Sequence, residues 1–206
     1  MIIVAVLFCY YNNKKENERM DKRMKHCGTQ QLETERLILR RYLNEDAAAM
    51  YKNWASDQEV TKFLTWPAHQ NQAVSQSIIN DWVERYSNEN YYHWAIVLKE
   101  NGEEPVGDIA VIDIREKMSI AHIGYCIGRA WWHKGITSEA LKAVMDFLFD
   151  KVDVKRIEAR HDPRNPNSGN VMKKCGMKYE GTLRGYDWNN QGISDACYYA
   201  LLQSER

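Results

Sequence analysis

Residues 120–141 have the sequence IAHIGYCIGRAWWHKGITSEAL, and this stretch carries the clearest structural pattern in the chain. Its first part, Ile120–Ile127, is a mostly apolar run that ends at a glycine, as is typical of a buried strand. The segment 135–152 has apolar residues at 3.6-residue spacing with charged residues between them, which predicts an amphipathic helix. A strand, a turn that contains glycine and a long helix therefore follow one another.

The turn between this strand and this helix is a candidate anion site. The first N–H groups of a helix lack intrahelical acceptors and lie at the positive end of its dipole, so they attract phosphate. Gly135 lets the main chain approach a phosphate, and Thr137 or Ser138 is predicted as the N-cap. Lys134 precedes the glycine, so the P-loop order is absent, and no G-x-G-x-x-G occurs. A plain strand–helix turn without a ligand is the alternative.

The rest of the chain predicts a mixed sheet covered by helices rather than the strict β–α alternation of a Rossmann domain. The turn cluster 162–167 contains two prolines and is predicted to exclude helix, with Ser168 as the N-cap of the helix that follows. Asn44 is predicted to cap the first helix. The predicted helices are 45–55, 71–86, 135–152 and 168–175, and the predicted strands are 37–42, 92–98, 106–114, 120–127, 156–161, 177–188 and 193–202.

Composition excludes several classes of protein. The 206 residues include 28 Lys and Arg and 28 Asp and Glu, so the formal net charge is zero and direct nucleic-acid binding is not expected. No C-x-x-C or H-E-x-x-H occurs, so no metal site is predicted. Scattered cysteines predict reduced thiols and a cytoplasmic location; they are Cys9, Cys27, Cys126, Cys175 and Cys197.

The N-terminus differs from the remainder. Residues 1–30 are predicted to be a poorly ordered extension, and residues 31–206 a single domain. The first eleven residues are almost wholly apolar, but a bilayer span needs about 20, so stable membrane insertion is not expected. They lack the flanking features of a secretory signal. Basic residues outnumber acidic ones over 12–25, which leaves association with a membrane surface as an alternative.

Three sequence blocks resemble the GNAT acetyltransferases, especially their ribosomal-protein (RimJ/RimL-like) branch. The blocks are IGYCI at 123–127 with WHKGITSEA at 132–140, DPRNPNS at 162–168 with KCGM at 174–177, and LETERLILR at 32–40. They occur in family order, and the resemblance covers about residues 32–202. It implies the GNAT acyl-CoA N-acyltransferase fold of the α/β (α+β) class, with a mixed, mostly antiparallel sheet of about seven strands flanked by about four helices.

The resemblance also implies an acetyl-CoA-dependent N-acetyltransferase without a metal. Loop amides would hold the pyrophosphate, a strand-end N–H would contact the thioester carbonyl, and Asn165 would meet the pantetheine arm. The implied cofactor-binding residues are Cys126, Ile127, Trp132, His133, Lys134, Gly135, Ile136, Thr137, Asn165 and Ser168. In this branch the position of Trp132 is often Arg or Gln, that of His133 is usually Gly, and that of Thr137 is usually Gly or Ala. The affinity for the cofactor is therefore expected to differ.

Two residues are predicted to be catalytic, because direct transfer needs a proton acceptor for the amine and a proton donor for the thiolate. The resemblance makes Ser168 the donor, with helix capping as the alternative role. His122 is the predicted base, since relatives often have Glu there and alternation puts it on the face of Cys126, itself expected as a small side chain on the cofactor face. A surface histidine is the alternative, and Asp113 or Glu116 could act through water.

The acceptor stays open at this point. A protein N-terminal amine, or a small amine such as an amino acid, polyamine or antibiotic, would suit this chemistry, and a CoA-binding module without turnover is the alternative from another class. A homodimer is one option for the oligomeric state. Six aromatic residues are expected to pack in the core and in the helical region that covers the acceptor site in relatives, rather than to contact the acceptor. They are Trp54, Trp66, Trp82, Tyr91, Tyr92 and Trp94.

Overall fold

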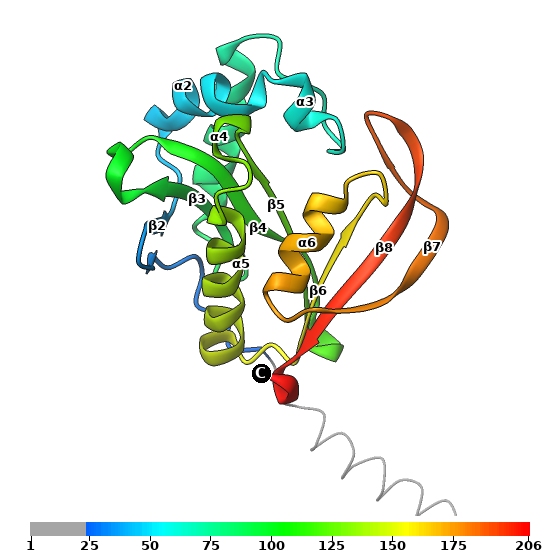
Figure 1. Cartoon of the computed structure of the whole chain (residues 1–206). Coiled ribbons are helices and arrows are strands. Elements are labelled where there is room, and N and C mark those ends of the chain that lie inside the picture. The colour runs from blue at the N-terminus through cyan, green and yellow to red at the C-terminus, as the bar shows by residue number, and fades with distance from the viewer. Residues whose placement is uncertain (1–23) are drawn as a thin grey trace, which may run out of the picture.

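The computed structural model describes residues 24–206, whose strands form one sheet of eight in the order β1-β2-β3-β4-β5-β6-β8-β7 (Figure 1). Neighbouring strands are antiparallel except β5 and β6, which are parallel. The predicted mixed sheet is confirmed, and the additional strand is β1, whose two residues are too few to give a hydrophobic pattern. The strands are β1 (Leu32–Glu33), β2 (Leu37–Arg40), β3 (His93–Leu98), β4 (Pro105–Arg115), β5 (Ile120–Ile127), β6 (Arg156–His161), β7 (Lys178–Asn189) and β8 (Gly192–Leu202).

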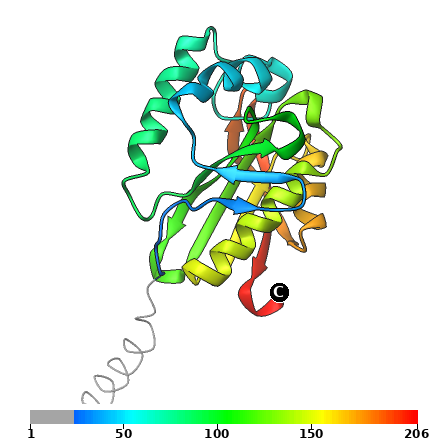
Figure 2. The same ribbon diagram turned by 90° about the vertical axis from the view of Figure 1, so that its left-hand side faces the viewer.

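Helices lie on both faces of the sheet. In Figure 2, α5 (Ile136–Phe147) and α6 (Pro166–Lys174) lie to the right of the sheet and α4 (Gln72–Arg85) to the left. α2 (Ala47–Met50) packs against α4 and, with the 3-10 turn before it and the π-helical turn after it, confirms the helix predicted at 45–55. α3 (Gln58–Thr61) packs against that π-helical turn, and its four residues are too few for a periodic signal. The shorter helical turns are 3-10 at Asn44–Asp46, Lys99–Asn101, Glu116–Met118, Arg129–Trp131 and Gln203–Glu205, and π-helical at Tyr51–Ala55 and Leu148–Val152.

Two apolar clusters hold these layers together. The larger lies between the sheet and α5 and α6, and includes Trp94, Ile123 and Leu141. The smaller lies between the sheet and the α2–α4 group, and includes Trp54 and Ile79. Each fully buried side chain of this size contributes roughly 1.5–3 kcal/mol. Trp54, Tyr92 and Trp94 are buried, so the prediction that they pack in the core is confirmed.

β5 and β6 separate after a short paired region. Ile120–His122 pair with Arg156–Glu158, and the remainder of β5 pairs with β4 alone. The rest of β6 continues beside β8 as far as the pair His161–Cys197. The edge of β5 beyond His122 is therefore open toward β6, on the path that leads to the N-terminus of α5.

Residues 24–30 pack on the domain, which moves the predicted boundary at residue 30. Met24 and Thr29 are buried, and the Lys25 N–H donates to the carbonyl of Val152 at 2.8 Å. The predictions of an extension and of membrane-surface contact for residues 1–23 lie outside the described residues. Within residues 24–206, no helix combines the length and apolar character needed to cross a bilayer.

Three predicted helix starts are wrong. α6 begins at Pro166, where a proline fits because the first helical N–H needs no partner, so Ser168 lies inside the helix and does not cap it. The N-cap of α5 is Gly135 rather than Thr137 or Ser138. Leu43, not Asn44, precedes the first helical turn. Capping propensity was outweighed in each case by the path that the chain takes from the preceding strand or turn.

Candidate active site

The loop between β5 and α5 presents a row of free amides. None of the backbone N–H groups from His133 to Ser138 has a hydrogen-bond acceptor among residues 24–206, and the N–H of Glu139 is the first to bond, to the carbonyl of Gly135 at 3.1 Å. His133 and Gly135 both have left-handed backbone, with φ of +62° and +76°. Donors at the positive end of a twelve-residue helix form a site suited to an anion such as a phosphate.

Arg36 fixes this loop to the first turn of α5. Its Nη1 donates to the carbonyl of Lys134 at 3.0 Å, and its Nε donates to Glu139 Oε2 at 2.7 Å. Glu139 Oε1 also accepts from the Arg36 N–H at 3.0 Å and from the Thr34 hydroxyl at 2.5 Å. Partial burial raises the pKa of Glu139, but these bonds outweigh it and lower the pKa. Arg36 therefore engages the carbonyl of Lys134, which lies within the row of free amides.

His133 occupies a position that favours glycine. A left-handed backbone costs an ordinary residue about 1–2 kcal/mol, and histidine tolerates it better than β-branched residues do. The loop therefore holds His133 in a conformation that glycine would adopt without strain.

Replacing His133 with valine is expected to lower the free energy of unfolding by about 1–2 kcal/mol, because a β-branched side chain strains a left-handed backbone. Urea unfolding followed by circular dichroism measures the change. His133→Gly is the matched control and is expected to stay within about 1 kcal/mol of the wild type. Equal stability of the valine variant and the wild type would contradict the assigned backbone.

The Trp132 side chain anchors the loop to the end of β5. Its indole Nε1 donates to the carbonyl of Ile127 at 2.9 Å, and its ring packs against both apolar clusters. The N–H of Trp132 bonds to the carbonyl of Arg129 at 3.2 Å, so it is not among the free amides. Within the segment 132–137, the free donors begin at His133, while Trp132 has a supporting role.

The strand end directs one amide into the opening beside β6. The N–H of Gly128 donates to the carbonyl of Val106 at 2.9 Å, and Ile127 lies opposite Gly107. Bonding alternates along an antiparallel pair, so the N–H of Ile127 points away from β4 and the N–H of Cys126 points toward it. Of the two residues predicted to contact a carbonyl, Ile127 has the free donor.

The Cys126 side chain lies on the face opposite α5 and α6. Its Sγ donates to Asp108 Oδ1 at 2.7 Å, and it packs against the cluster under α2 and α4 rather than on the predicted cofactor face. Burial, and then the Asp108 carboxylate, raise the pKa of the Cys126 thiol well above its usual value. The thiol therefore stays protonated and is no nucleophile.

Ser168 meets Tyr125 across the opening between β5 and α6. The two hydroxyl oxygens lie 3.1 Å apart, and the Tyr125 hydroxyl donates to the Ser168 carbonyl at 3.0 Å. Burial raises the pKa of Tyr125 far above 10, so its phenol keeps its proton. Tyr125 was not predicted as a site residue, although alternation with Ile123 and Ile127 places it on the face of α5 and α6.

Asn165 lies at the N-cap position of α6. Its side-chain amide has no hydrogen-bond partner among the described residues, and its N–H bonds to the carbonyl of Asp162 at 2.8 Å. Burial raises the pKa of Asp162, but bonds from Arg164 and Asn189 outweigh it and lower the pKa to about 2. The turn is thus held by ionic and polar bonds, while the Asn165 amide stays free to meet a ligand.

His122 is buried, so the surface alternative is wrong. It is 5% exposed, and burial followed by the Arg160 charge lowers its pKa to about 4. His122 and Cys126 are four positions apart on β5, so their backbones are separated by about 13 Å. The proton-acceptor role stays a prediction, and the low pKa makes this imidazole a weak base. The two predicted carboxylate alternatives are exposed, and Glu116 bonds to His26 at 2.8 Å.

Removing the His122 imidazole is expected to flatten the dependence of stability on pH. The folded pKa lies below the unfolded value of about 6.5, so the unfolded state binds the proton first and stability falls as pH drops from about 6.5 toward about 4. Between about pH 7 and about pH 5, the wild type should lose about 2 kcal/mol more than His122→Asn. Urea titrations at both pH values measure it, and parallel losses would contradict it.

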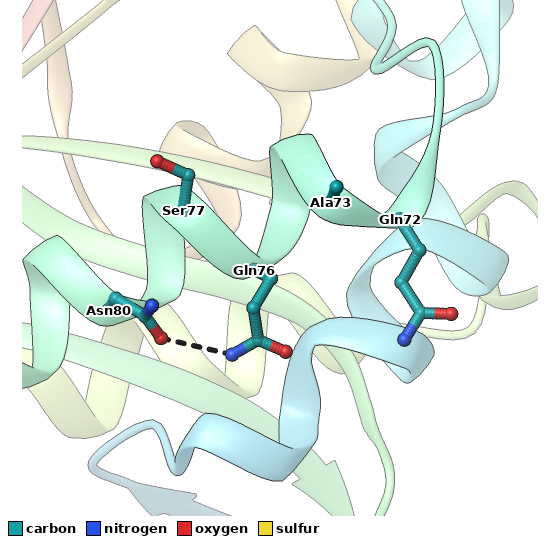
Figure 3. Close-up of a pocket in the computed structure, with 5 residues that line it drawn as sticks. All are labelled: Gln72, Ala73, Gln76, Ser77 and Asn80. Carbon is teal, nitrogen blue, oxygen red and sulfur yellow. Dashed lines mark hydrogen bonds between the residues drawn. The ribbon is translucent and has the colours of Figure 1, made fainter.

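Two other features lie apart from this constellation. A hollow on the outer side of α4 is lined by Gln72, Ala73, Gln76, Ser77 and Asn80 (Figure 3). It has no titratable side chain, and Gln76 Nε2 bonds to Asn80 Oδ1 at 3.0 Å, so it provides no acid–base chemistry. Within residues 24–206, no three His, Cys, Asp or Glu side chains gather as metal ligands would.

This chain is similar to known proteins both in sequence and in fold. Residues 36–178 match the family described as acetyltransferase (GNAT) domain. The uncharacterised N-acetyltransferase p20 of Bacillus licheniformis is 34% identical over 180 residues, covering 84% of this chain and 97% of that protein. The [ribosomal protein uS5]-alanine N-acetyltransferase of Escherichia coli is 25% identical over 162 residues, covering 75% of this chain and 81% of that protein.

Solved structures agree with the assignment. A GNAT-family acetyltransferase from Bacillus anthracis has a TM-score of 0.74 at 25% identity, covering 85% of this chain and all (100%) of that one. The ribosomal-protein-S5-alanine acetyltransferase of Vibrio fischeri has a TM-score of 0.75 at 20% identity, covering 85% of this chain and 98% of that one, which shows the shared fold. The match over 36–178, the named relatives and the common fold together establish that this chain is an N-acetyltransferase and belongs to the GNAT family.

Proposed function

We propose that this enzyme transfers the acetyl group of acetyl-CoA to a primary amine by direct attack on the thioester. One observation carries the proposal: a row of unpaired amides, His133 to Ser138, lies at the N-terminus of α5 and beside the opening between β5 and β6. That placement lets a single extended ligand bind its diphosphate at the helix and reach the strand end with its acyl group.

Each part of the ligand has a candidate partner. The free amides suit the pyrophosphate, and their donors do not depend on which side chains the loop carries. The Asn165 amide suits the pantetheine arm, and the N–H of Ile127 suits the thioester carbonyl, where it would stabilise the oxyanion that forms during attack. The pair of Ser168 and Tyr125 lies at the same opening and suits protonation of the departing thiolate.

The acceptor we favour is the N-terminal amine of a protein. Support comes from the E. coli relative named for alanine acetylation of ribosomal protein uS5, at 25% identity. A small-molecule amine is the remaining candidate class.

Two measurements test the proposal. Isothermal titration calorimetry with acetyl-CoA should show saturable binding, and hydrogen exchange should show protection of the amides 133–138. A panel of N-terminal Ala and Ser peptides, amino acids, polyamines and aminoglycosides, assayed for free CoA release, should then identify the acceptor. Absence of acetyl-CoA binding and of amide protection would overturn the proposal, whereas turnover of small amines alone would redirect only the acceptor class.

A further inference from the structure

The tip of the β7–β8 hairpin is bonded to a distant part of the chain, the segment 61–66 at the end of α3 and in the loop after it. Asn190 Nδ2 donates to the carbonyls of Thr61 and Trp66, each at 2.8 Å. Its backbone N–H donates to the carbonyl of Leu64 at 3.1 Å. Loop tips are usually exposed and are among the most mobile parts of a protein. Three bonds from one residue therefore hold this tip in a fixed position.

An irregularity in β7 bends the hairpin toward this contact. From Leu183 to Asp187, β7 advances four positions while its partner β8 advances two, so β7 contains extra residues there. Gly185 lies among them with a φ of +60°, and its N–H donates to Asp195 Oδ1 at 2.8 Å. Extra residues in one strand of a pair bend that strand and increase its twist. In Figure 1, the hairpin curves beyond the end of β6, and its tip approaches the loop after α3.

Two more polar contacts turn this bridge into a closed frame. Just after β6, the buried Asp162 accepts at Oδ2 from Asn189 Nδ2 at 2.8 Å. Just after β5, Arg129 Nε lies 2.9 Å from Oδ2 of Asp57, the N-cap residue of α3. The chain and these contacts make one circuit, which runs from β5 through Arg129 to α3, through Asn190 to the hairpin, and through Asn189 to β6. We call this circuit the frame.

The frame surrounds the place where β5 and β6 diverge. His122 and Glu158 are the last residues at which the two strands pair, and this pair closes the circuit at its other end. Ile127, whose N–H points away from β4, lies on the β5 side of the frame. α3 contributes to the apolar cluster on the sheet face opposite α5 and α6. A group that approaches the Ile127 N–H from that face therefore has to pass inside the frame.

We propose that Asn190 fixes the size of the frame and thereby limits the acceptor to an amine whose carbon carries a small substituent, as at a chain end that begins with alanine. This inference rests on the proposed function. Asn190 is a positioning residue, because it contacts the segment 61–66 and not the acceptor or the acyl donor. The other two contacts also hold local structure, since Asp162 Oδ1 accepts from the Arg164 N–H and Asp57 Oδ1 from the Glu59 N–H. Asn190 is therefore the point at which one side chain can be changed to loosen the frame alone.

The variants Asn190→Ala and Asn190→Asp test the inference. Both remove the side-chain donors and keep the backbone bond to Leu64, so the hairpin should stay folded, which thermal unfolding checks. Alanine amide and phenylalanine amide are the acceptors, because they differ only in the phenyl group that has to pass the frame. The wild type is expected to prefer alanine amide, and the ratio of the two kcat/KM values is expected to fall by about fivefold or more in both variants. Gln191→Ala, which changes the next side chain of the same turn, is the matched control and should keep the wild-type ratio.

Hydrogen exchange on the full chain adds a measurement that does not depend on turnover. The amide of Asn190 should exchange faster in both variants than in the wild type, while the Kd for acetyl-CoA stays within about twofold. The role of Asn190 would be overturned by unchanged exchange, by an unchanged kcat/KM ratio, or by a wild type that does not prefer alanine amide. Failure of acetyl-CoA to bind, or of every amine in the panel to react, would instead overturn the proposed function.

Discussion

Replacing Ser168 with alanine is expected to lower kcat about 100-fold, with little change in the Kd for acetyl-CoA. The Ser168 hydroxyl lies at the opening where the thiolate departs, and a positioned proton donor is typically worth 10²–10⁴-fold, so about 100 is a low expectation. A thiol has a lower pKa than an alcohol, so the thiolate of coenzyme A can also leave without being protonated. This limits the expected loss in kcat. Single-turnover release of CoA measures the effect without interference from product dissociation.

Tyr125→Phe is the companion variant, because it removes the hydroxyl that bonds to Ser168 and leaves the ring. It should reduce kcat less than Ser168→Ala does, since water can replace a bridging hydroxyl. Thermal unfolding of both variants checks that the domain is intact. A Ser168→Ala enzyme with full activity would show that the thiolate leaves unaided or takes its proton from water, and Ser168 would then have a purely structural role beside Tyr125.

Replacing Arg36 with alanine is expected to raise the Kd for acetyl-CoA about tenfold, which is about 1.4 kcal/mol of binding free energy. The change frees the carbonyl of Lys134 and leaves the Glu139 carboxylate without its cation in the first turn of α5. An unpaired negative charge at that position repels a phosphate. The Arg36 side chain is 46% exposed, so the loss of protein stability should remain below about 1 kcal/mol.

Two further variants separate the causes of this effect. Adding Glu139→Gln to Arg36→Ala should recover part of the affinity, because it removes the repelling charge while the loop carbonyl stays free. Arg36→Lys should give an intermediate Kd, since a lysine restores the charge but cannot bond to the carbonyl and the carboxylate together. Calorimetry at a fixed ionic strength measures all four proteins. An unchanged Kd in Arg36→Ala would show that the loop keeps its shape without this bridge.

The order of elements and the position of the anion site could be predicted from the sequence, because both depend on local patterns. Apolar spacing placed β5 and β6 at their observed limits and α5 within a few residues. Gly135 marked the start of α5, where free amides gather regardless of side-chain identity. The two-residue strand β1 and the four-residue helix α3 were missed, since a pattern needs more residues than these elements have.

The helix starts and the roles of individual side chains depended on contacts between distant residues. Ser168 had the signature of an N-cap, yet α6 begins two residues earlier and turns this hydroxyl toward Tyr125, 43 positions away. His122 had a suitable pKa in isolation, but packing against β6 and its arginines buried it and lowered that pKa. The burial and the charge partners of a side chain depend on neighbours from many elements that are distant in the sequence. A short stretch of sequence does not contain those neighbours.

Local sequence patterns predicted a mixed sheet and a row of N–H donors at the start of α5, whereas the chemistry of acyl transfer followed from the resemblance to the GNAT family. The tertiary structure alone decided which hydroxyl, amide and carboxylate come together. The reason is geometric: β4 brings Asp108 beside Cys126 through strand register, and the divergence of β5 and β6 opens a path between Ile127 and Ser168. Register and divergence are set by the packing of the whole sheet, and side chains acquire their functions from the neighbours that this packing gives them.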